Sequence, residues 1–397
     1  MFISRKRFLK NSLLTGSVLT LSKFQNELYA YGSEDSNLHR KDPFLYAENL
    51  GITLPIQKIL MAAILAPNSH NSQPWKIKIE SNSSFLLFAD PTKQLPEIDP
   101  LNRQLFHSQG TFLELSKLAA DALMYDANIE LFPKGNPNGS RSTLSLRPIA
   151  RFKISEKTEC VHDFLFQGLP QRRTNRSVYG GSYLIQSEID DLLNLIGSTK
   201  QKIKISLDPN EIKSLTPIIY DAFCMETNRY DSNELNRNWF RVTTEDIYSK
   251  RDGLTLEGNG LSGIKLWFVK KFIIDLSKEA WHNQSTVKAG NDLFLEQVES
   301  SKALVFFTTE KSDTERDWIE TGMDFMRFSL ACALRGFAFH TMNQSLEDYK
   351  ESKIFQNKLK EKLGLGKQTS IQLLARLGKS SYQFSSPRKD LQEFLIG

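Results

Sequence analysis

The pattern of hydrophobic and polar positions predicts a first unit of helices and strands between about residues 46 and 155. Apolar residues recur at helical spacing over 56–65, just after a proline suited to the first turn of a helix. The residues that follow alternate between apolar and polar, as in a half-buried strand. The expected order is a helix at 56–65, strands at 76–79 and 84–89, a helix at 108–124, and two further strands joined by a turn rich in Gly, Asn and Pro at 133–142.

A second unit begins near residue 170. The elements expected in it are helices at 187–196, 210–230 and 265–280, a strand at 302–308, a helix at 318–334, strands at 337–342 and 368–377, and a final helix that begins at Pro387. Residues 251–260 are too rich in glycine for regular structure and form either a mobile cover or a long surface connection. We therefore predict an α+β fold with one half at 46–160 and another at 170–397, the second carrying a lid at 231–290. Residues 31–45 read as a polar linker.

Composition agrees with two globular units and argues against a nucleic-acid-binding protein. A chain of 397 residues is long for one compact core, and its 40% hydrophobic and 24% charged content is ordinary for a globular protein. The net charge is +5, but the first thirty residues hold five basic side chains and one acidic one, and so account for four of these charges. The rest of the chain is nearly neutral, and it therefore lacks the basic face that phosphate backbones require.

Neither the cysteines nor the histidines form a recognisable metal site. The three cysteines, Cys160, Cys224 and Cys332, are far apart and form no CxxC motif, so neither a disulfide framework nor a zinc site is expected. The six histidines show no HExxH spacing. We predict no metal site and interpret all three cysteines as core thiols.

The N-terminus has the pattern of a targeting segment. A basic stretch, Ser4–Lys10, precedes a modestly apolar run at 12–21 that is too short for a membrane span, which needs about 20 residues. Its sequence resembles the twin-arginine export motif, with Lys6 where the second arginine is usual. We therefore predict a signal peptide at 1–30 and a periplasmic or otherwise exported protein. The alternative is a cytoplasmic protein with a basic tail.

The loop at 66–75 is the part of the chain most suggestive of a ligand site. Between its prolines it holds two asparagines, two serines, one histidine and one glutamine. It therefore offers side-chain amides, hydroxyls and turn-fixed backbone N–H groups in one place, which suits a flat, hydrogen-bonding ligand. The alternative is a turn that only joins a helix to a strand, with Trp75 in the core. His70 is accordingly either a ligand contact or a structural histidine bonded within its own turn.

This loop resembles the PSxxNxQPW signature of the nitroreductase family, which binds FMN. It matches at Pro67, Asn71, Gln73, Pro74 and Trp75, and differs in having Asn68 where the family usually has serine. Further blocks follow in family order: Asp90-Pro91, Leu95-Pro96, Asp99-Pro100, Arg103 and Gly110; Arg172-Arg173-Thr174-Asn175-Arg176; Gly322-Met323, Arg327 and Gly336; and Pro387-Arg388-Lys389. Together they resemble the Acg-type branch, in which one chain contains two nitroreductase-like halves. The resemblance runs from about residue 50 to the C-terminus.

The resemblance implies a set of cofactor-binding residues. An FMN phosphate calls for clustered guanidinium groups, because their planar forks bind phosphate oxygens bidentately. The phosphate ligands implied are Arg172, Arg173, Arg176 and the Thr174 hydroxyl, with Arg388 and Lys389 closing the other side; the loop ligands are Pro67, Asn68, Ser69 and Asn71. Without the resemblance, the arginine segment would read as a solvated basic loop.

The resemblance also implies a nitroreductase-like fold, in which two fused halves, each a mixed sheet with helices, imitate the family dimer. The arginine segment and the 66–75 loop occur once each, in different halves, so a single chain could build one complete site as a monomeric pseudo-dimer. The only earlier basic pair, Arg40-Lys41, is a poor second arginine motif.

The function implied is an FMN-dependent oxidoreductase that takes electrons from NAD(P)H and passes them to a small acceptor such as a nitroaromatic or a quinone. No nucleophile or acid–base pair stands out, so the sequence predicts no catalytic residue. The alternative is a protein that stores or sequesters FMN without turnover. A third possibility is oxygen-dependent chemistry on the flavin itself.

Overall fold

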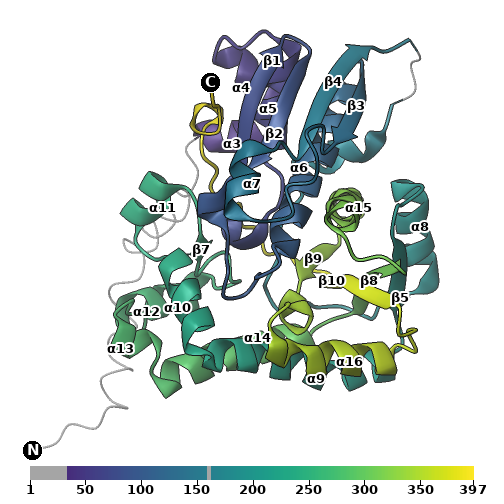
Figure 1. The fold of residues 1–397 in the computed structure, drawn as a ribbon. Coiled ribbons are helices and arrows are strands. Elements are labelled where there is room, and N and C mark those ends of the chain that lie inside the picture. The colour runs from purple at the N-terminus through teal and green to yellow at the C-terminus, as the bar shows by residue number, and fades with distance from the viewer. Residues whose placement is uncertain (1–33, 159–161) are drawn as a thin grey trace, which may run out of the picture.

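The computed structural model describes residues 34–158 and 162–397 (Figure 1). The predicted signal peptide, with its export-like motif, and Cys160 lie outside the described residues. In the described part, no helix is long and apolar enough to cross a membrane. Of the two remaining cysteines, Cys332 is buried as predicted, whereas Cys224 is only partly buried.

The first half is built on a four-stranded antiparallel sheet. Its strands are β1 (Trp75–Ser81), β2 (Ser84–Ala89), β3 (Tyr125–Leu131) and β4 (Ala150–Glu156), in the order β1-β2-β4-β3. The apolar strand β2 is almost entirely buried, whereas β1 alternates and exposes Lys78. Helix α5 (Pro55–Ala63) precedes β1, and α7 (Arg141–Leu146) lies in the connection between β3 and β4.

The second half repeats this topology. Its strands are β5 (Lys202–Ser206), β8 (Ala303–Glu310), β9 (Ala338–Thr341) and β10 (Thr369–Gly378), in the antiparallel order β5-β8-β10-β9. In each half a helix precedes the first strand, α5 in one and α8 (Gln186–Ile196) in the other. Successive residues of β8 face different cores: Val305 belongs to the core shared with the first half, and Phe306 to a second core beneath the sheet. This sheet is therefore buried on both faces.

Two long helices join the halves. Helix α6 (Arg103–Ala122) and helix α15 (Glu315–Leu334) pack against each other between the sheets (Figure 1). Each has a glycine at its eighth position, where a Cβ would lie 2.0 Å (Gly110) or 2.1 Å (Gly322) from a backbone oxygen of the other helix. Only glycine permits so close an approach. The correspondence of the two helices and the two sheets agrees with the prediction of an α+β chain made of two similar halves.

The second half differs from the first in having a large insertion between β5 and β8. It contains α9 (Pro209–Asn228), α10 (Tyr230–Trp239), β6 (Phe240–Arg241), α11 (Thr244–Lys250), β7 (Leu254–Thr255), α12 (Gly263–Phe272), α13 (Lys278–Trp281) and α14 (Gln284–Glu299). Helices α9 and α14, with α16 (Lys353–Lys362), cover the outer face of the second sheet, while α10–α13 extend beyond it (Figure 1).

The C-terminal tail returns to the first half. The Ile77 N–H donates to the Phe394 carbonyl (2.8 Å) and the Ile396 N–H donates to the Ile77 carbonyl (2.9 Å), so the tail forms a parallel bridge at the free edge of β1. A second parallel bridge joins Thr174 to Phe339. Among the described strands the two main sheets are otherwise antiparallel, so the mixed character expected of each sheet comes from these bridges.

Three sequence-based expectations about elements were wrong. The described part of the linker expected at 31–45 is helical: α3 (Glu34–Lys41) is followed by α4 (Pro43–Asn49), which Asp42 caps and whose first turn Pro43 fits. No final helix begins at Pro387, because the backbone there is held by the 66–75 loop and only a short turn, η6 (Leu391–Glu393), forms. The helix at 265–280 is two helices, α12 and α13.

Candidate functional site

The loop after α5 is fixed by an arginine from the far end of the chain. Arg388 donates from Nε to the Ile64 carbonyl (3.1 Å) and from Nη2 to the Ala66 carbonyl (3.1 Å). Both carbonyls lie just past the last residue of α5, where the helix dipole favours a cation. Arg388 additionally donates to the Asn71 side chain. Its first role is therefore to hold the loop in place.

Within the loop, side chains and backbone are tightly engaged. The Asn68 side chain accepts the Gln73 N–H (2.8 Å) and donates to the Ala66 carbonyl (3.1 Å). His70, Asn71 and Gln73 all have φ near +50°, a left-handed conformation that persists in non-glycine residues only where the surroundings enforce it. Trp75 is fully buried, so the interpretation of Trp75 as core is confirmed. The loop is thus a rigid, strained element and more than a plain turn.

The loop faces a cavity of about 560 Å3 that opens to solvent between the two halves. Eight of the ten residues predicted to bind the cofactor line it: Pro67, Asn68, Asn71, Arg172, Arg173, Thr174, Arg176 and Arg388. The structure therefore brings the loop and the arginine segment together, although they are about a hundred residues apart in the chain.

The other two predicted residues lie beside the cavity. The Ser69 hydroxyl donates to Gln104 (3.1 Å), and the Ser69 backbone N–H donates to the Ser108 hydroxyl (3.2 Å). The Lys389 ammonium group lies 4.0 Å from Asp252 and 3.7 Å from Glu393, while its backbone N–H donates to the Gln73 side chain. Both residues support the loop, and their role toward a cofactor stays a prediction.

Four arginines crowd one end of the cavity without a carboxylate partner. Arg40 and Arg172 are 5% and 4% exposed, and Arg173 and Arg388 lie close enough to repel them. No Asp or Glu in the described residues forms an ion pair with any of the four. Burial, followed by this mutual repulsion, lowers the pKa of Arg172 to about 9, that of Arg388 to about 10, and that of Arg40 well below its ordinary value.

Several donors of this cluster are left without acceptors. Within the described residues, Nε of Arg172, Nε of Arg173 and Nη1 of Arg40 are buried and have no hydrogen-bond partner. Buried polar atoms are almost always paired, and buried unpaired charges are costly. An anion in the cavity would both supply acceptors and offset the repulsion among the guanidinium groups.

Arg40 is the most informative lining residue that the sequence pattern does not assign to the site. It lies in α3, before either half, and its Nη2 donates to the Ser386 carbonyl (3.3 Å). The Asp42-Pro43 helix start was a local signal for this segment, but nothing in the sequence shows that α3 packs against the cavity. The other unpredicted lining residues are Gly253, Leu254, Thr255, Gly258, Phe384, Ser386 and Pro387.

The insertion supplies one wall of the cavity. Gly253 has φ +79°, and a Cβ there would lie 2.3 Å from the Trp239 carbonyl, so only glycine fits. Its N–H donates to the Asn71 carbonyl (3.4 Å), and Arg176 donates to the Gly258 carbonyl (3.1 Å). The glycine-rich segment that the sequence left open as cover or connection therefore contacts both the loop and the arginine segment.

His70 points away from the cavity into a buried polar chain. Its Nε2 lies 2.7 Å from the Asn236 side-chain oxygen, and the Asn236 amide donates to Glu226 (2.7 Å). Glu226 faces Glu347, and both are nearly fully buried. Burial raises the pKa of both carboxyl groups, and burial lowers the pKa of His70 to about 4. His70 therefore has structural contacts both within its own turn, to the Ser69 hydroxyl (3.2 Å), and outside it, to Asn236, and its role toward a ligand stays a prediction.

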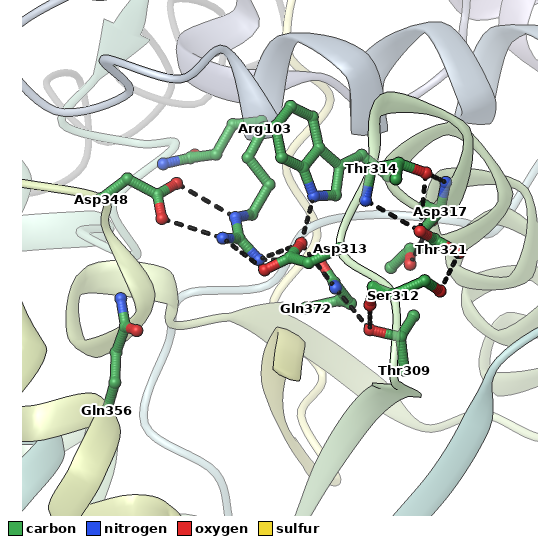
Figure 2. A network of polar contacts seen from close by, with 12 residues as sticks. Arg103, Thr309, Ser312, Asp313, Thr314, Asp317, Thr321, Asp348, Gln356 and Gln372 are labelled. Atoms are coloured by element: carbon green, nitrogen blue, oxygen red, sulfur yellow. Dashed lines mark hydrogen bonds and ion pairs between the residues drawn. The ribbon is translucent and has the colours of Figure 1, made fainter. Parts of the chain in front are cut away.

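A smaller hollow near the start of α6 contains a buried arginine, Arg103, whose charge is paired with carboxylates. Arg103 donates to both oxygens of Asp348 (2.8 and 3.0 Å) and to Gln372 (2.8 Å), and lies 3.3 Å from Asp313 (Figure 2). Asp313 also accepts the Trp318 indole N–H. This network ties the first half to the second and pairs the charge of Arg103 with two carboxylates. The cavity arginines have no such partners among the described residues, which distinguishes a binding site from a structural network.

The chain is similar to two curated proteins of Mycobacterium tuberculosis (strain ATCC 25618 / H37Rv). It is 29% identical over 124 residues to one named "Putative NAD(P)H nitroreductase Rv3131", and 31% identical over 124 residues to one named "Uncharacterized protein Rv3127". The matches cover 31% and 30% of this chain, and the chain spans only about a third (34%) of each relative. No family model matches the chain. The predicted resemblance to nitroreductases is confirmed by the first of these relatives, while the Acg-type branch stays a prediction.

Solved structures give weaker likenesses. The FMN and NADPH-dependent nitroreductase NfnB from sphigopyxis sp. strain HMH has a TM-score of 0.38 and 12% identity, and the match covers 59% of this chain and 98% of that one. An iodotyrosine deiodinase bound to FMN and 3-iodo-L-tyrosine has a TM-score of 0.33 and 10% identity, with 57% and 95% covered. TM-scores this low do not establish a shared fold, and the α+β assignment rests on the sheets and helices described above.

Proposed function

We propose that this chain, a relative of nitroreductases over 124 residues, binds FMN in the cavity between its halves and acts as an FMN-dependent oxidoreductase. The observation that carries the proposal is the cluster of buried arginines that lacks a carboxylate partner among the described residues. A phosphate group is the chemical complement of such a cluster, because its oxygens accept bidentate bonds from guanidinium groups.

The rest of the cavity offers groups suited to the remaining parts of FMN. Phe384, Leu254 and Pro67 provide apolar surface suited to a flat ring, and Thr174 and Thr255 offer hydroxyls. The amides of Asn68 and Asn71 are largely engaged within the protein, so the loop serves the ring mainly by its fixed shape and its backbone groups. Arg40, Arg172 and Arg173 would hold the phosphate, and Arg388 would keep the loop in register.

FMN, when bound, supplies the hydride and electron chemistry. The residues of this chain bind it, orient it and restrict the access of water through the wall formed by Gly253–Gly258. No titratable side chain other than the arginines lines the cavity in the described residues. The proposed reaction therefore relies on the cofactor, with NAD(P)H as donor and a small nitroaromatic or quinone as acceptor, as the resemblance implies.

The insertion wall favours a second candidate function, the storage of FMN without turnover. Contacts from the insertion reach both the loop and the arginine segment, and such a wall would slow the exchange of a bound ligand. Storage requires tight binding and slow release, whereas turnover also requires that NAD(P)H reach the ring.

Purification of the full chain tests the first step. A yellow protein with an FMN spectrum, or a colourless one that takes up FMN on reconstitution, supports the proposal, and a protein that binds no FMN overturns it. Anaerobic addition of NAD(P)H then separates the two functions. Bleaching followed by reoxidation with a nitroaromatic or a quinone supports the enzyme, while a flavin that stays oxidised supports storage.

We also propose that the protein is exported and that one chain forms the whole site as a monomer. The support for export is the basic, twin-arginine-like stretch at the N-terminus, and the support for a monomer is that both parts of the site belong to one chain. Cell fractionation tests the first statement and light scattering after gel filtration tests the second. A purely cytoplasmic protein would contradict export, and a cavity that forms only in a dimer would contradict the monomer.

A further inference from the structure

Helix α12 presents large apolar side chains to solvent on its outward face. Leu266 is buried and joins a small core with Val269 and Ile274, which anchors the helix to the insertion. Five large apolar side chains of this stretch are exposed: Ile264 (85%), Trp267 (38%), Phe268 (49%) and Phe272 (60%) on the helix, and Ile273 (51%) directly after it. These are five of the nineteen exposed large hydrophobic residues of the described chain, all within ten consecutive positions. They form a patch, unlike the scattered remainder.

The spacing shows that the patch is a stripe along the helix. Ile264, Phe268 and Phe272 are four residues apart, so they lie above one another on one side of α12. Trp267 borders that line, and Ile273 follows the last residue of the helix. Figure 1 shows α12 at the outer edge of the insertion, away from both sheets. Such a stripe faces inward in an ordinary surface helix, whereas here it faces out.

Positive charge accompanies the stripe. Residues 263–274 contain three lysines and no carboxylate. Lys271 is exposed and lies over the rings of Trp267 (5.2 Å) and Phe272 (5.6 Å), and Lys265 is exposed and forms an ion pair with Glu296 (3.8 Å). Lys270 is turned inward and pairs with Glu257. Two of the three lysines therefore border the apolar face.

We propose that α12 docks this protein onto an anionic lipid surface. A short helix with Trp and Phe on one side and lysines beside them is the type that lies in the membrane interface, with its rings among the headgroups and its ammonium groups near lipid phosphates. A second copy of this chain fits less well. In a twofold contact the lysines of both copies would be brought together, and against three lysines this segment and the residue that follows it offer a single carboxylate, that of the exposed Asp275.

Sedimentation of the full chain with lipid vesicles tests the proposal. Two kinds of vesicle are compared, phosphatidylcholine mixed with phosphatidylglycerol and phosphatidylcholine alone. We expect binding to the anionic vesicles, at least about tenfold weaker binding to the neutral ones, and a loss of binding at high salt. Trp267 emission should shift to shorter wavelength on binding. Equal binding to both vesicle types, or none to the anionic ones, would overturn the proposal.

Two sets of variants locate the contact. Phe268→Ser with Phe272→Ser keeps Trp267 as a reporter and should weaken partitioning about tenfold or more. Its matched control, Leu146→Ser with Ile354→Ser, removes two exposed apolar side chains outside α12 and should bind like the unaltered protein. Lys265→Glu with Lys271→Glu changes exposed charges only and should abolish the preference for anionic lipid.

These comparisons also exclude a contribution from the N-terminal segment, because every variant retains it. Unchanged vesicle binding in both α12 variants would overturn the proposal. So would a dimer, seen by light scattering, that dissociates in Phe268→Ser with Phe272→Ser, because a second copy would then cover the face.

Discussion

Arg172 is 4% exposed, yet its side chain donates no hydrogen bond to any described residue. A protein seldom buries an unpaired guanidinium group for stability, because desolvation of the charge is unfavourable and nearby like charges add to the cost. Arg103, at a similar depth, has its charge balanced by Asp348 and Asp313. The difference between these two arginines is the strongest local reason to place a binding function in the cavity.

Arg172→Met should therefore change stability and affinity in opposite directions. Removal of one of four mutually repelling charges should leave the ligand-free protein as stable or more stable, by about 1 kcal/mol. FMN binding should weaken by at least about 2 kcal/mol, since hydrogen bonds to charged groups contribute roughly 1.5–3 kcal/mol each. Thermal denaturation and fluorescence titration measure the two effects. Unchanged affinity would remove Arg172 from the phosphate site.

Arg40→Gln tests whether the arginine missed at the sequence level contacts the phosphate. We expect weaker binding of FMN, by about 2 kcal/mol, and little change for riboflavin, which has the same ring and no phosphate. Competition between the two flavins in one titration gives the ratio directly. Lys41→Gln, an exposed neighbour on the same helix, serves as control. An equal loss for both flavins would assign Arg40 to general packing.

The buried pair Glu226 and Glu347 makes stability depend on pH. Burial raises the pKa of Glu347 well above its ordinary value, and the charge of the neighbouring Glu226 raises it further. The charge of Asp99 acts in the same direction, whereas a hydrogen bond with Tyr349 lowers the pKa of Glu347 and the charge of Arg229 lowers that of Glu226. The folded state therefore holds a proton more tightly than the unfolded state, and stability should fall as the pH rises above about 4.5. Glu347→Gln should flatten this fall in melting temperature, and Glu361→Gln on the surface of α16 should not. Parallel curves for all three proteins would refute the assignment.

At the scale of elements, the contact of α6 with α15 decides how closely the halves approach. Each helix carries a glycine at which an added Cβ would lie within 2.1 Å of the partner's backbone, so neither position accepts even a methyl group. A shared position in two topologically equivalent helices indicates that the halves meet as similar subunits would. The distance between the sheets, and hence the width of the cavity, depends on this contact.

Gly322→Ala should be strongly destabilising, by about 3 kcal/mol or more, because the new methyl group must displace the His107 backbone. Gly290→Ala is the matched control, since Gly290 lies within helix α14 with no atom near its Cβ position. That change should stabilise by roughly 0.5–1 kcal/mol, as helix propensity predicts. Urea denaturation measures both. Similar free energies for the two variants would contradict close packing at Gly322.

The sequence predicted elements well where periodicity came from burial. The helix at 56–65 was found because its apolar residues face one core, and the strand at 84–89 because nearly all of its residues are buried. Prediction from the sequence failed where tertiary contacts decide the local structure. Residues after Pro387 look like a helix start, but Arg388 caps α5 from a distance and keeps the segment extended. Likewise, no local pattern shows that Arg40 reaches the cavity, because its burial depends on contacts with the C-terminal tail.

At the scale of the whole molecule, the cavity is a product of five separate stretches of chain. The stretches are α3, the 66–75 loop, the arginine segment, the insertion and the C-terminal tail. The sequence identified the second, third and fifth through the family resemblance, and it identified the insertion only as a glycine-rich segment. Short-range signals cannot reveal a site whose parts are joined across the full length of the protein.

Phe394→Ala tests how far the tail supports this assembly. Phe394 is buried at 3% exposure and packs against Trp75, so its removal should destabilise the protein by about 3–5 kcal/mol. FMN affinity should fall as well, because Arg388 precedes Phe394 on the same tail. Ile396→Ala, at a residue 39% exposed, should have a much smaller effect on both. A stable Phe394→Ala protein with normal affinity would show that the tail is dispensable.

Because the C-terminal tail pairs with β1, this part of the fold can form only late in synthesis. Arg388 contacts a helix that is synthesised more than three hundred residues earlier, and Leu395 pairs with Ile77 across a similar span. During translation these tail residues leave the ribosome only after the strands of both sheets have emerged. The loop can therefore reach its strained conformation only once the tail has been released. The proposed binding of FMN would accordingly be a late event in synthesis, and a ribosome-bound chain whose tail is still inside the exit tunnel should remain without flavin.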